Sequence, residues 1–400
     1  LYCLHLYIIK RHMFSSTNFL SQYDSLKATS LKSRVLSNSD IEPLLSLLSD
    51  TFHVSTLGHS EIGLPIHGVK IGSGPKRILL WSQMHGNEST TTKALFDLFN
   101  YLKLEDFNAF LGTCTLFIIP ILNPDGAKAY TRLNANKVDL NRDAINRSQK
   151  ESIILRSVFN EFKPHYCFNL HGQRTIFSAG KSNNSSVISF LSPSEDAERT
   201  VTITRKKSMS IIHSMNGVLQ IYLPNQIGRY DDGFNANCVG DQFQTLGVPT
   251  VLFEAGHYPG DYSREETRKY IALSIFTAIE CIAYNKVGED TSSLYFDIPE
   301  NDTLFNDVII RNALLDPSNP NDFCDIGIQH KEVLGPNGLL FKPTIDFIGD
   351  LSKKHGHMEI NANFKAVSHP DFSVLSENYE IDFLLVEFVK KALFIENNLT

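Results

Sequence analysis

Apolar residues recur along the chain in short and nearly continuous runs. Such runs are typical of strands that are buried on both faces of a sheet. They predict strands over the ranges 66–74, 76–84, 114–122, 165–171, 218–224 and 250–256.

Between these runs, the apolar positions follow the period of an α-helix. The helix predicted over residues 91–103 carries apolar side chains along one face, at Leu95, Leu98, Phe99 and Leu102. Strands that alternate with helices indicate a layered α/β domain, which we expect to span roughly residues 40–285.

Two further helices are predicted from their start signals. The first spans residues 39–52, with Ser39 or Asp40 as its N-cap. The second is a long helix over residues 263–284, whose first turn has a capping-box pair, Ser263 and Glu266.

The character of the sequence changes at about residue 290. The stretch that follows is rich in Pro, Asn and Asp, with short strand-like pieces between turns. We expect a poorly defined N-terminal extension over residues 1–38, the α/β domain over 39–289, and a small β-rich region over 290–400. Within the last region, residues 371–400 form a closing segment with no clear pattern.

Composition and charge argue against several classes of protein. Of the 400 residues, 42% are hydrophobic and 20% are charged, which is ordinary for a globular protein. The net charge is −7 and no long Lys/Arg run offsets it, so we expect no nucleic-acid partner. No apolar segment approaches the roughly 20 residues that a membrane-spanning helix needs.

The first residues of the chain do not follow the order of a secretory signal. The apolar stretch "LYCLHLYII" precedes its positive charges rather than following them, and we expect Met13 to be the true start. The six cysteines are scattered singly, which suits a reducing compartment. We therefore expect a cytoplasmic protein.

The first candidate functional residues follow the strand predicted over residues 76–84. His85 and Glu88 stand three residues apart there, around a glycine. A polar turn that caps the next helix would explain this pair, and so would half of a metal site. On its own, the H-x-x-E pattern does not decide between them.

Other polar residues favour the metal site, because they also stand where predicted strands end. His171 ends the strand over residues 165–171, and two histidines with one glutamate are natural Zn²⁺ ligands that leave a position open. Glu254 follows another apolar strand, where an unpaired carboxylate is costly unless it has a function. In open α/β sheets, ligands bind at such strand ends.

A third stretch, "NPDGAKAYTRLNANKVDLNRD" over residues 123–143, adds charged and amide side chains. Arg132, Asn141 and Arg142 surround Asp139 in this loop. A structural ion pair between Asp139 and Arg142 is an equally open explanation for these residues.

Taken together, these stretches resemble the zinc carboxypeptidase family, the carboxypeptidase A-like metallopeptidases. The motifs H-G-N-E, N-P-D-G, R…V-D-L-N-R, the strand-terminal histidine and F-E-A-G occur in that family's order. The resemblance covers about residues 50–285 and begins with the lead-in "GHSEIGLPIHGVKIG". It implies an α/β/α sandwich with a mixed central sheet, to which the small, mostly β C-terminal appendage is added.

The resemblance implies a Zn²⁺ cofactor held by His85, Glu88 and His171. Asp139 would fix the tautomer of His85 from the far side of the ring. Glu254 would act as the general base and acid.

The resemblance also implies how the substrate is held. Arg142 and Asn141 would grip the carboxylate at the C-terminal end of a peptide. Arg132 would polarise the scissile carbonyl and hold the oxyanion. Tyr230 would correspond to a mobile tyrosine that closes over the substrate. The implied activity is that of a metallocarboxypeptidase acting on a peptide or small amide with a free carboxylate.

Several alternatives stay open at this stage. Arg174 is either a residue that selects substrate or an ordinary exposed arginine, and Asp241 would favour a basic substrate if it lined the pocket. An amidase or acylase of the same superfamily, acting on N-acyl amino acids or γ-glutamyl peptides, fits the same motifs. So does a catalytically silent binding module. The sequence indicates no oligomeric state.

Overall fold

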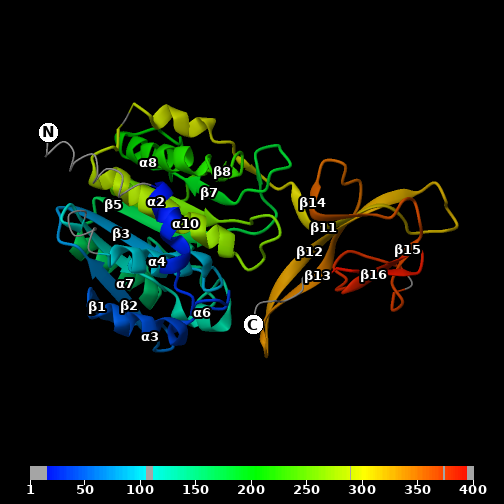
Figure 1. The fold of residues 1–400 in the computed structure, drawn as a ribbon, viewed down its shortest axis with the longest axis horizontal. Helices are drawn as coiled ribbons and strands as arrows, with labels where there is room; N and C mark the ends of the chain where they lie inside the picture. The colour runs from blue at the N-terminus through cyan, green and yellow to red at the C-terminus, as the bar shows by residue number, and fades with distance from the viewer. Residues whose placement is uncertain (1–15, 105–110, 289, 373, 394–400) are drawn as a thin grey trace.

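The computed structural model describes residues 16–104, 111–288, 290–372 and 374–393. It has a broad sheet flanked by helices, and a smaller β part projects from one side of this layered body (Figure 1). The expectations for the first residues, including Met13, lie outside the described ranges. No helix in these ranges is both long enough and apolar enough to span a bilayer.

The central sheet of the described part has eight strands in the order β1-β2-β4-β3-β5-β9-β7-β8. The pairs β3–β4, β3–β5, β5–β9 and β7–β8 are parallel, and the other three pairs are antiparallel. The sheet is therefore mixed, as expected. The strand bounds are β1 (His53–His59), β2 (Pro65–Ile71), β3 (Lys76–Ser82), β4 (Cys114–Ile119), β5 (Tyr166–Gly172), β7 (Ile188–Leu191), β8 (Ile227–Arg229) and β9 (Thr250–Ala255).

Helices cover both faces of this sheet, because successive strand residues point to opposite sides. On β3, Ile78 and Leu80 join the core with α2, α3, α4, α8 and α10, whereas Leu79 and Trp81 join the core with α7 and α9. This arrangement confirms the predicted α/β/α sandwich. The helix bounds are α2 (Ser16–Leu26), α3 (Asn38–Leu48), α4 (Thr90–Leu102), α6 (Pro124–Ala129), η2 (Leu140–Arg142), α7 (Lys150–Phe162), α8 (Ile203–Leu219), α9 (Val239–Thr245), α10 (Glu265–Ala283) and η3 (Ser292–Asp297).

The start of α3 differs from the prediction. Its N-cap is Ser37, and neither Ser39 nor Asp40 takes that position. The carboxylate of Asp40 instead accepts a hydrogen bond from the backbone N–H of Ser37 at 2.8 Å, which is the return half of a capping box.

The capping box predicted for the long helix α10 is also wrong. Arg264 precedes the helix with a left-handed φ of 63°, so the chain enters by a tight turn. The carboxylate of Asp261 takes over the capping role, because it accepts the backbone N–H of Glu266 at 2.7 Å. Ser263 caps no backbone group of the helix in the described structure and contacts Asp261 through its hydroxyl.

The strand predicted over residues 218–224 is wrong as well. Its first residues are the end of α8, and a turn follows. Leu219 and Leu223 are buried in the core, so the run is apolar because the end of α8 and the turn after it pack there. A short apolar run does not distinguish a strand from a buried helix end. The strands β1, β7 and β8 of the central sheet lie outside the predicted strand ranges.

The C-terminal part is rich in β-structure, as expected. Its larger sheet has the order β13-β12-β11-β14, and a smaller one has the order β15-β16-β17. These strands enclose a core of their own, with Val308, Ile326 and Ile345 fully buried. The bounds are β11 (Phe305–Leu314), β12 (Phe323–Gly335), β13 (Gly338–Gly349), β14 (His355–Asn361), β15 (Val367–Ser368), β16 (Phe383–Val386) and β17 (Val389–Ala392), while β10 (Asn301–Asp302) pairs with β6 (Ser178–Ala179).

The hairpin of β12 and β13 contacts the α/β layers. Glu332 of β12 lies 2.7 Å from a guanidinium nitrogen of Arg34 and accepts a hydrogen bond from the hydroxyl of Tyr130 at 2.6 Å. Phe341 of β13 packs against Tyr130. Cζ of Arg34 lies over the Phe341 ring, 5.6 Å from its centroid. The hairpin is thereby fixed next to the ends of the central strands, where the candidate site lies.

Candidate functional site

The polar segment between β3 and α4 brings His85 and Glu88 together with His171, the penultimate residue of β5. Nδ1 of His85 lies 2.8 Å from one oxygen of Glu88, and Nδ1 of His171 lies 3.0 Å from the other. The two Nδ1 atoms are 3.1 Å apart. The backbone N–H of Gly172 donates to Glu88 at 2.9 Å and so fixes the carboxylate in place.

This cluster fits a metal ion. The three ligand atoms all lie within 4.8 Å of one another, and both imidazoles turn the same nitrogen, Nδ1, inward. Two facing imidazole nitrogens beside a carboxylate form an electron-rich pocket that a bound cation would satisfy. Two histidines with one carboxylate are also a donor set that catalytic Zn²⁺ sites use.

The charged groups of the cluster shift one another's pKa values. Burial lowers the pKa of His85, but the charge of Glu88 and hydrogen bonds to Asp139 and Glu88 raise it to about 9. Burial alone would raise the pKa of Glu88, yet His85 and His171 hold it well below its usual range. Burial keeps the pKa of His171 below its ordinary value. Glu88 is therefore ionised between its two imidazoles.

Asp139 lies behind His85, on the side of the ring away from the cluster. Its Oδ1 is 3.1 Å from Nε2 of His85, and its Oδ2 accepts two hydrogen bonds from Arg132, at 3.0 and 3.1 Å. Arg132 also lies 3.5 Å from Glu88. The ion pair of Asp139 is therefore with Arg132, and the expected alternative of a pair with Arg142 is wrong.

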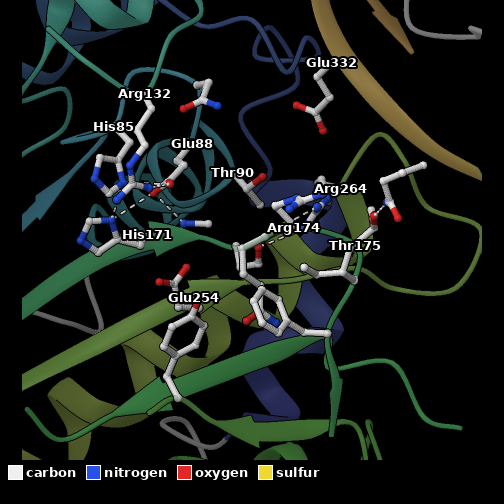
Figure 2. A pocket seen from close by; sticks show the side chains of 18 of the residues that line it. His85, Glu88, Thr90, Arg132, His171, Arg174, Thr175, Glu254, Arg264 and Glu332 are labelled. Carbon is white, nitrogen blue, oxygen red and sulfur yellow. Dashed lines mark hydrogen bonds and ion pairs between the residues drawn. The ribbon is translucent and has the colours of Figure 1, made fainter. Parts of the chain in front are cut away.

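Glu254 lies beside the cluster because of the strand register. It is the direct partner of His171 across the parallel pair β5–β9, so both side chains emerge on the same face of the sheet. Its side chain is buried, and Oε2 has no hydrogen-bond partner among the described residues. Burial and the charge of Glu88 raise its pKa well above the ordinary value. Figure 2 shows Glu254 below His171 and Glu88, in the same cavity.

Arg142 and Asn141 lie on another wall of the cavity, on η2. Arg142 donates from one nitrogen to the carbonyl of Asn141 at 2.8 Å and to Sγ of Cys238 at 2.9 Å. Asn141 accepts the backbone N–H of Val239, at the start of α9, at 3.1 Å. No carboxylate in the described structure pairs with Arg142, so its guanidinium can receive one from a ligand.

Tyr230 and Asp241 also line this cavity. Tyr230 follows β8 and packs against Phe177, with ring centroids 5.5 Å apart; burial and the nearby Glu254 raise its pKa. Both oxygens of Asp241 accept backbone N–H groups, those of Ser194 and Asn235, each at 3.1 Å. Burial raises the pKa of Asp241 to about 6.

All of the residues proposed from the sequence meet around one cavity of about 1200 Å³, either lining it or, for Asp139, lying directly behind a lining residue. The cavity also has walls that were not predicted. Arg34, Arg264, Glu332 and Phe341 line it, and the last two come from the β-rich C-terminal part. No local sequence signal marks these residues, because they reach the cavity through contacts between segments that are distant in the chain.

Comparisons with known proteins agree with this geometry. Residues 38–211 match the family model described as "Zinc carboxypeptidase". The chain is 28% identical over 114 residues to "Carboxypeptidase 2" of Trichophyton tonsurans, which covers 28% of this chain and 20% of that protein. It is 29% identical over 150 residues to "Carboxypeptidase SOL1" of Arabidopsis thaliana, covering 34% and 29%. The chain thus spans less than a third of the length of these curated relatives.

A solved structure shares the fold. The metallo-carboxypeptidase from Burkholderia cenocepacia superposes with a TM-score of 0.51 at 15% identity, covering 63% of this chain and 70% of that one. The range matched by the family model contains His85, Glu88, Asp139 and His171 but ends before Glu254. The position of Glu254 therefore rests on the strand register described above.

Proposed function

Because residues 38–211 are a domain of the zinc carboxypeptidase family, we propose that residues 39–289 form the catalytic domain of a zinc-dependent hydrolase. We propose that it cleaves the amide bond before a C-terminal residue. The observation that carries the proposal is the juxtaposition of Glu254 with the cluster of His85, Glu88 and His171. A buried carboxylate without a partner, beside three convergent ligands, is costly for a merely structural role.

His85, Glu88 and His171 would hold the zinc ion. Asp139 would accept a hydrogen bond from Nε2–H of His85, so that Nδ1, which faces the cluster, is the nitrogen that gives up its proton to a metal. When bound there, zinc would supply a Lewis acid that polarises the scissile carbonyl and activates water.

Glu254 moves the protons of the reaction. It takes one from the attacking water and later delivers it to the nitrogen of the departing amino acid. Its raised pKa suits both tasks, because a carboxylate with a raised pKa is a stronger base than an ordinary one. Arg132, half-exposed beside Glu88, would stabilise the negative charge that develops on the carbonyl oxygen.

Arg142 and Asn141 anchor the C-terminal carboxylate of the substrate. Arg142 uses one nitrogen for Cys238 and the backbone, which leaves the rest of its fork for two-point recognition. Asn141 has its oxygen engaged by Val239, so its amide nitrogen is the group that can donate to a ligand. Tyr230 would cover the bound substrate from the side of β8.

The test is to strip the purified protein with a chelator, restore it with zinc, and assay peptides that have a free C-terminus. We expect one zinc per chain and release of the C-terminal residue. His171→Ala should abolish both, whereas His213→Ala, on α8 outside the cavity, should change neither. Zinc binding without hydrolysis of any peptide or N-acyl amino acid would contradict the proposal and would favour a silent binding module.

A further inference from the structure

The β12–β13 hairpin closes one side of the cavity. Glu332 and Phe341 line the cavity from this hairpin, and contacts with Arg34 and Tyr130 hold it against the α/β layers. A substrate that extends toward the hairpin therefore meets a fixed wall. This geometry favours short substrates over long chains.

The hairpin lies on the acyl side of the scissile bond. Arg142, the proposed anchor for the amine-side carboxylate, belongs to the layer of η2 and α9 on one face of the sheet. Arg264 directly precedes α10, which packs on the opposite face. His171 and Glu254 stand at strand ends between these two layers, so an acyl group that leads away from Arg142 runs toward Arg264.

Arg264 is a buried cation, and no anion among the described residues forms an ion pair with it. Within these residues its guanidinium donates to backbone carbonyls alone: those of Ala255 and Gly256 from Nη1, and that of Gln173 from Nη2 at 3.0 Å. Arg264 is only 3% exposed, and its Nε has no hydrogen-bond partner in the described structure. Burial and the charge of Arg34 lower its pKa to about 10. A buried charge in this state is stabilised by an anion that approaches it.

Two carboxylates that line the cavity from the C-terminal part, those of Glu332 and Asp307, are already engaged. Glu332 forms an ion pair with Arg34 and accepts a hydrogen bond from the hydroxyl of Tyr130. Asp307 accepts the hydroxyl of Tyr262 at 2.8 Å and the backbone N–H of His330 at 2.7 Å. These two carboxylates are held by other donors.

Arg174 supplies a second guanidinium at the same place. It stands two residues after β5, is exposed within the cavity, and has no hydrogen-bond or ion-pair partner among the residues that the structure describes. The preceding residue, Gln173, is held through its carbonyl by Arg264, so Arg264 positions the segment that carries Arg174. Figure 2 shows Arg174 and Arg264 on the same side of the metal-ligand cluster, with Thr175 and Glu332.

We propose that Arg174, positioned by Arg264, binds a carboxylate on the acyl side of the substrate. The preferred substrates would then be short amides with two anionic ends, one carboxylate on the departing amino acid and one on the acyl group. This inference rests on the proposed function, because the acyl side is defined by hydrolysis next to Glu254.

The experiment compares two amides of the same amino acid, chosen as the one that the zinc-loaded protein releases fastest from a dipeptide panel. One amide carries an N-glutaryl group and the other an N-glutaramoyl group, which replaces the distal carboxylate by a neutral amide of the same shape. We expect kcat/KM to favour the glutaryl compound by about tenfold or more, the value of one charged hydrogen-bonded contact.

Matched variants assign this preference to Arg174. Arg174→Gln should bring the ratio of the two kcat/KM values close to one, and Arg174→Lys should keep part of the preference. Lys181→Gln removes the same charge from an exposed position outside the cavity and should keep the full ratio.

A ratio near one in the wild-type protein, or a full ratio in Arg174→Gln, would overturn the subsite. Hydrolysis of the dipeptides together with failure on the glutaryl amide would overturn it while leaving the proposed function intact. Failure on every amide, with zinc bound, would overturn both.

Discussion

Nε2 of His85 lies 3.1 Å from Oδ1 of Asp139, on the side of the ring opposite to the Nδ1 that faces Glu88 and His171. One imidazole therefore has its two nitrogens assigned to different tasks. The outer nitrogen faces Asp139, which favours a proton there, and the inner nitrogen faces the cluster, where it would bind a metal once its own proton is lost.

Asp139→Asn should weaken zinc binding without unfolding the protein. The amide keeps the size of the side chain but lacks the charge that fixes the proton on His85, and loss of such a partner typically costs about 10- to 100-fold in metal affinity. Competition against a chromogenic chelator measures this. Asp50→Asn, at an exposed turn, is the control. An unchanged affinity in Asp139→Asn would show that the tautomer of His85 is fixed by other contacts.

Arg142→Lys should impair recognition of the free C-terminus. Lysine keeps the charge but loses the two-point grip, so we expect a cost of about 2 kcal/mol, or roughly 30-fold in kcat/KM. Peptides with an amidated C-terminus should be poor substrates for the wild-type protein. Their kcat/KM should be the same for the wild-type protein and for Arg142→Lys. Equal cleavage of amidated and free peptides by the wild-type protein would be incompatible with anchoring at Arg142.

Asp97→Ala should destabilise the layer that packs behind the site. The carboxylate of Asp97 on α4 lies 2.6 Å from Arg268 on α10 and accepts the hydroxyl of Tyr23 on α2 at 2.8 Å. Both members of the ion pair are almost completely buried, so removal of Asp97 leaves the buried guanidinium of Arg268 with Glu265, at 3.1 Å, as its remaining anionic partner. We expect a loss of about 3–5 kcal/mol in the free energy of unfolding, measured with urea.

The double variant Asp97→Leu with Arg268→Met is the matched comparison. Replacement of both charges by apolar groups should recover much of the loss, because no unpaired charge then remains. A loss below about 1 kcal/mol in Asp97→Ala would mean that Glu265 or solvent compensates the charge of Arg268, and the pair with Asp97 would then contribute little.

The residues of the cluster were visible in the sequence because they interrupt a strong pattern. His171 and Glu254 each end an apolar run that becomes a central strand, where a polar side chain is conspicuous. Since parallel neighbours end at the same edge of the sheet, their meeting could be expected. The layered fold was predictable for the same reason, as it follows from the alternation of long strands and helices.

The remaining features depend on contacts that leave no local pattern. The run over residues 218–224 is apolar because it ends α8 in the core, so periodicity alone assigned it wrongly. The wall near Arg264 joins residues from segments as distant as Arg34 and Glu332, and only the folded chain brings them together. The alternative of an ion pair between Asp139 and Arg142 stayed open because the loop holds two arginines, Arg132 and Arg142, and spacing does not choose between them; the structure pairs Asp139 with Arg132.

Glu254→Gln tests the central claim, which is that this carboxylate moves protons beside a zinc ion. Glutamine keeps the shape of the side chain and removes the base. A buried carboxyl group with a raised pKa binds its proton more tightly in the folded state, so its ionisation costs stability as the pH rises above its unfolded pKa. Loss of that charge should therefore leave the melting temperature at pH 8 unchanged or higher.

The decisive measurement is turnover of a free C-terminal peptide by zinc-loaded Glu254→Gln, with zinc content and melting temperature determined on the same preparation. We expect full zinc occupancy, a native melting temperature, and a kcat lower by about 10²–10⁴, the usual contribution of a positioned acid–base group. Turnover at the wild-type rate, or loss of the fold together with the activity, would contradict the role of Glu254.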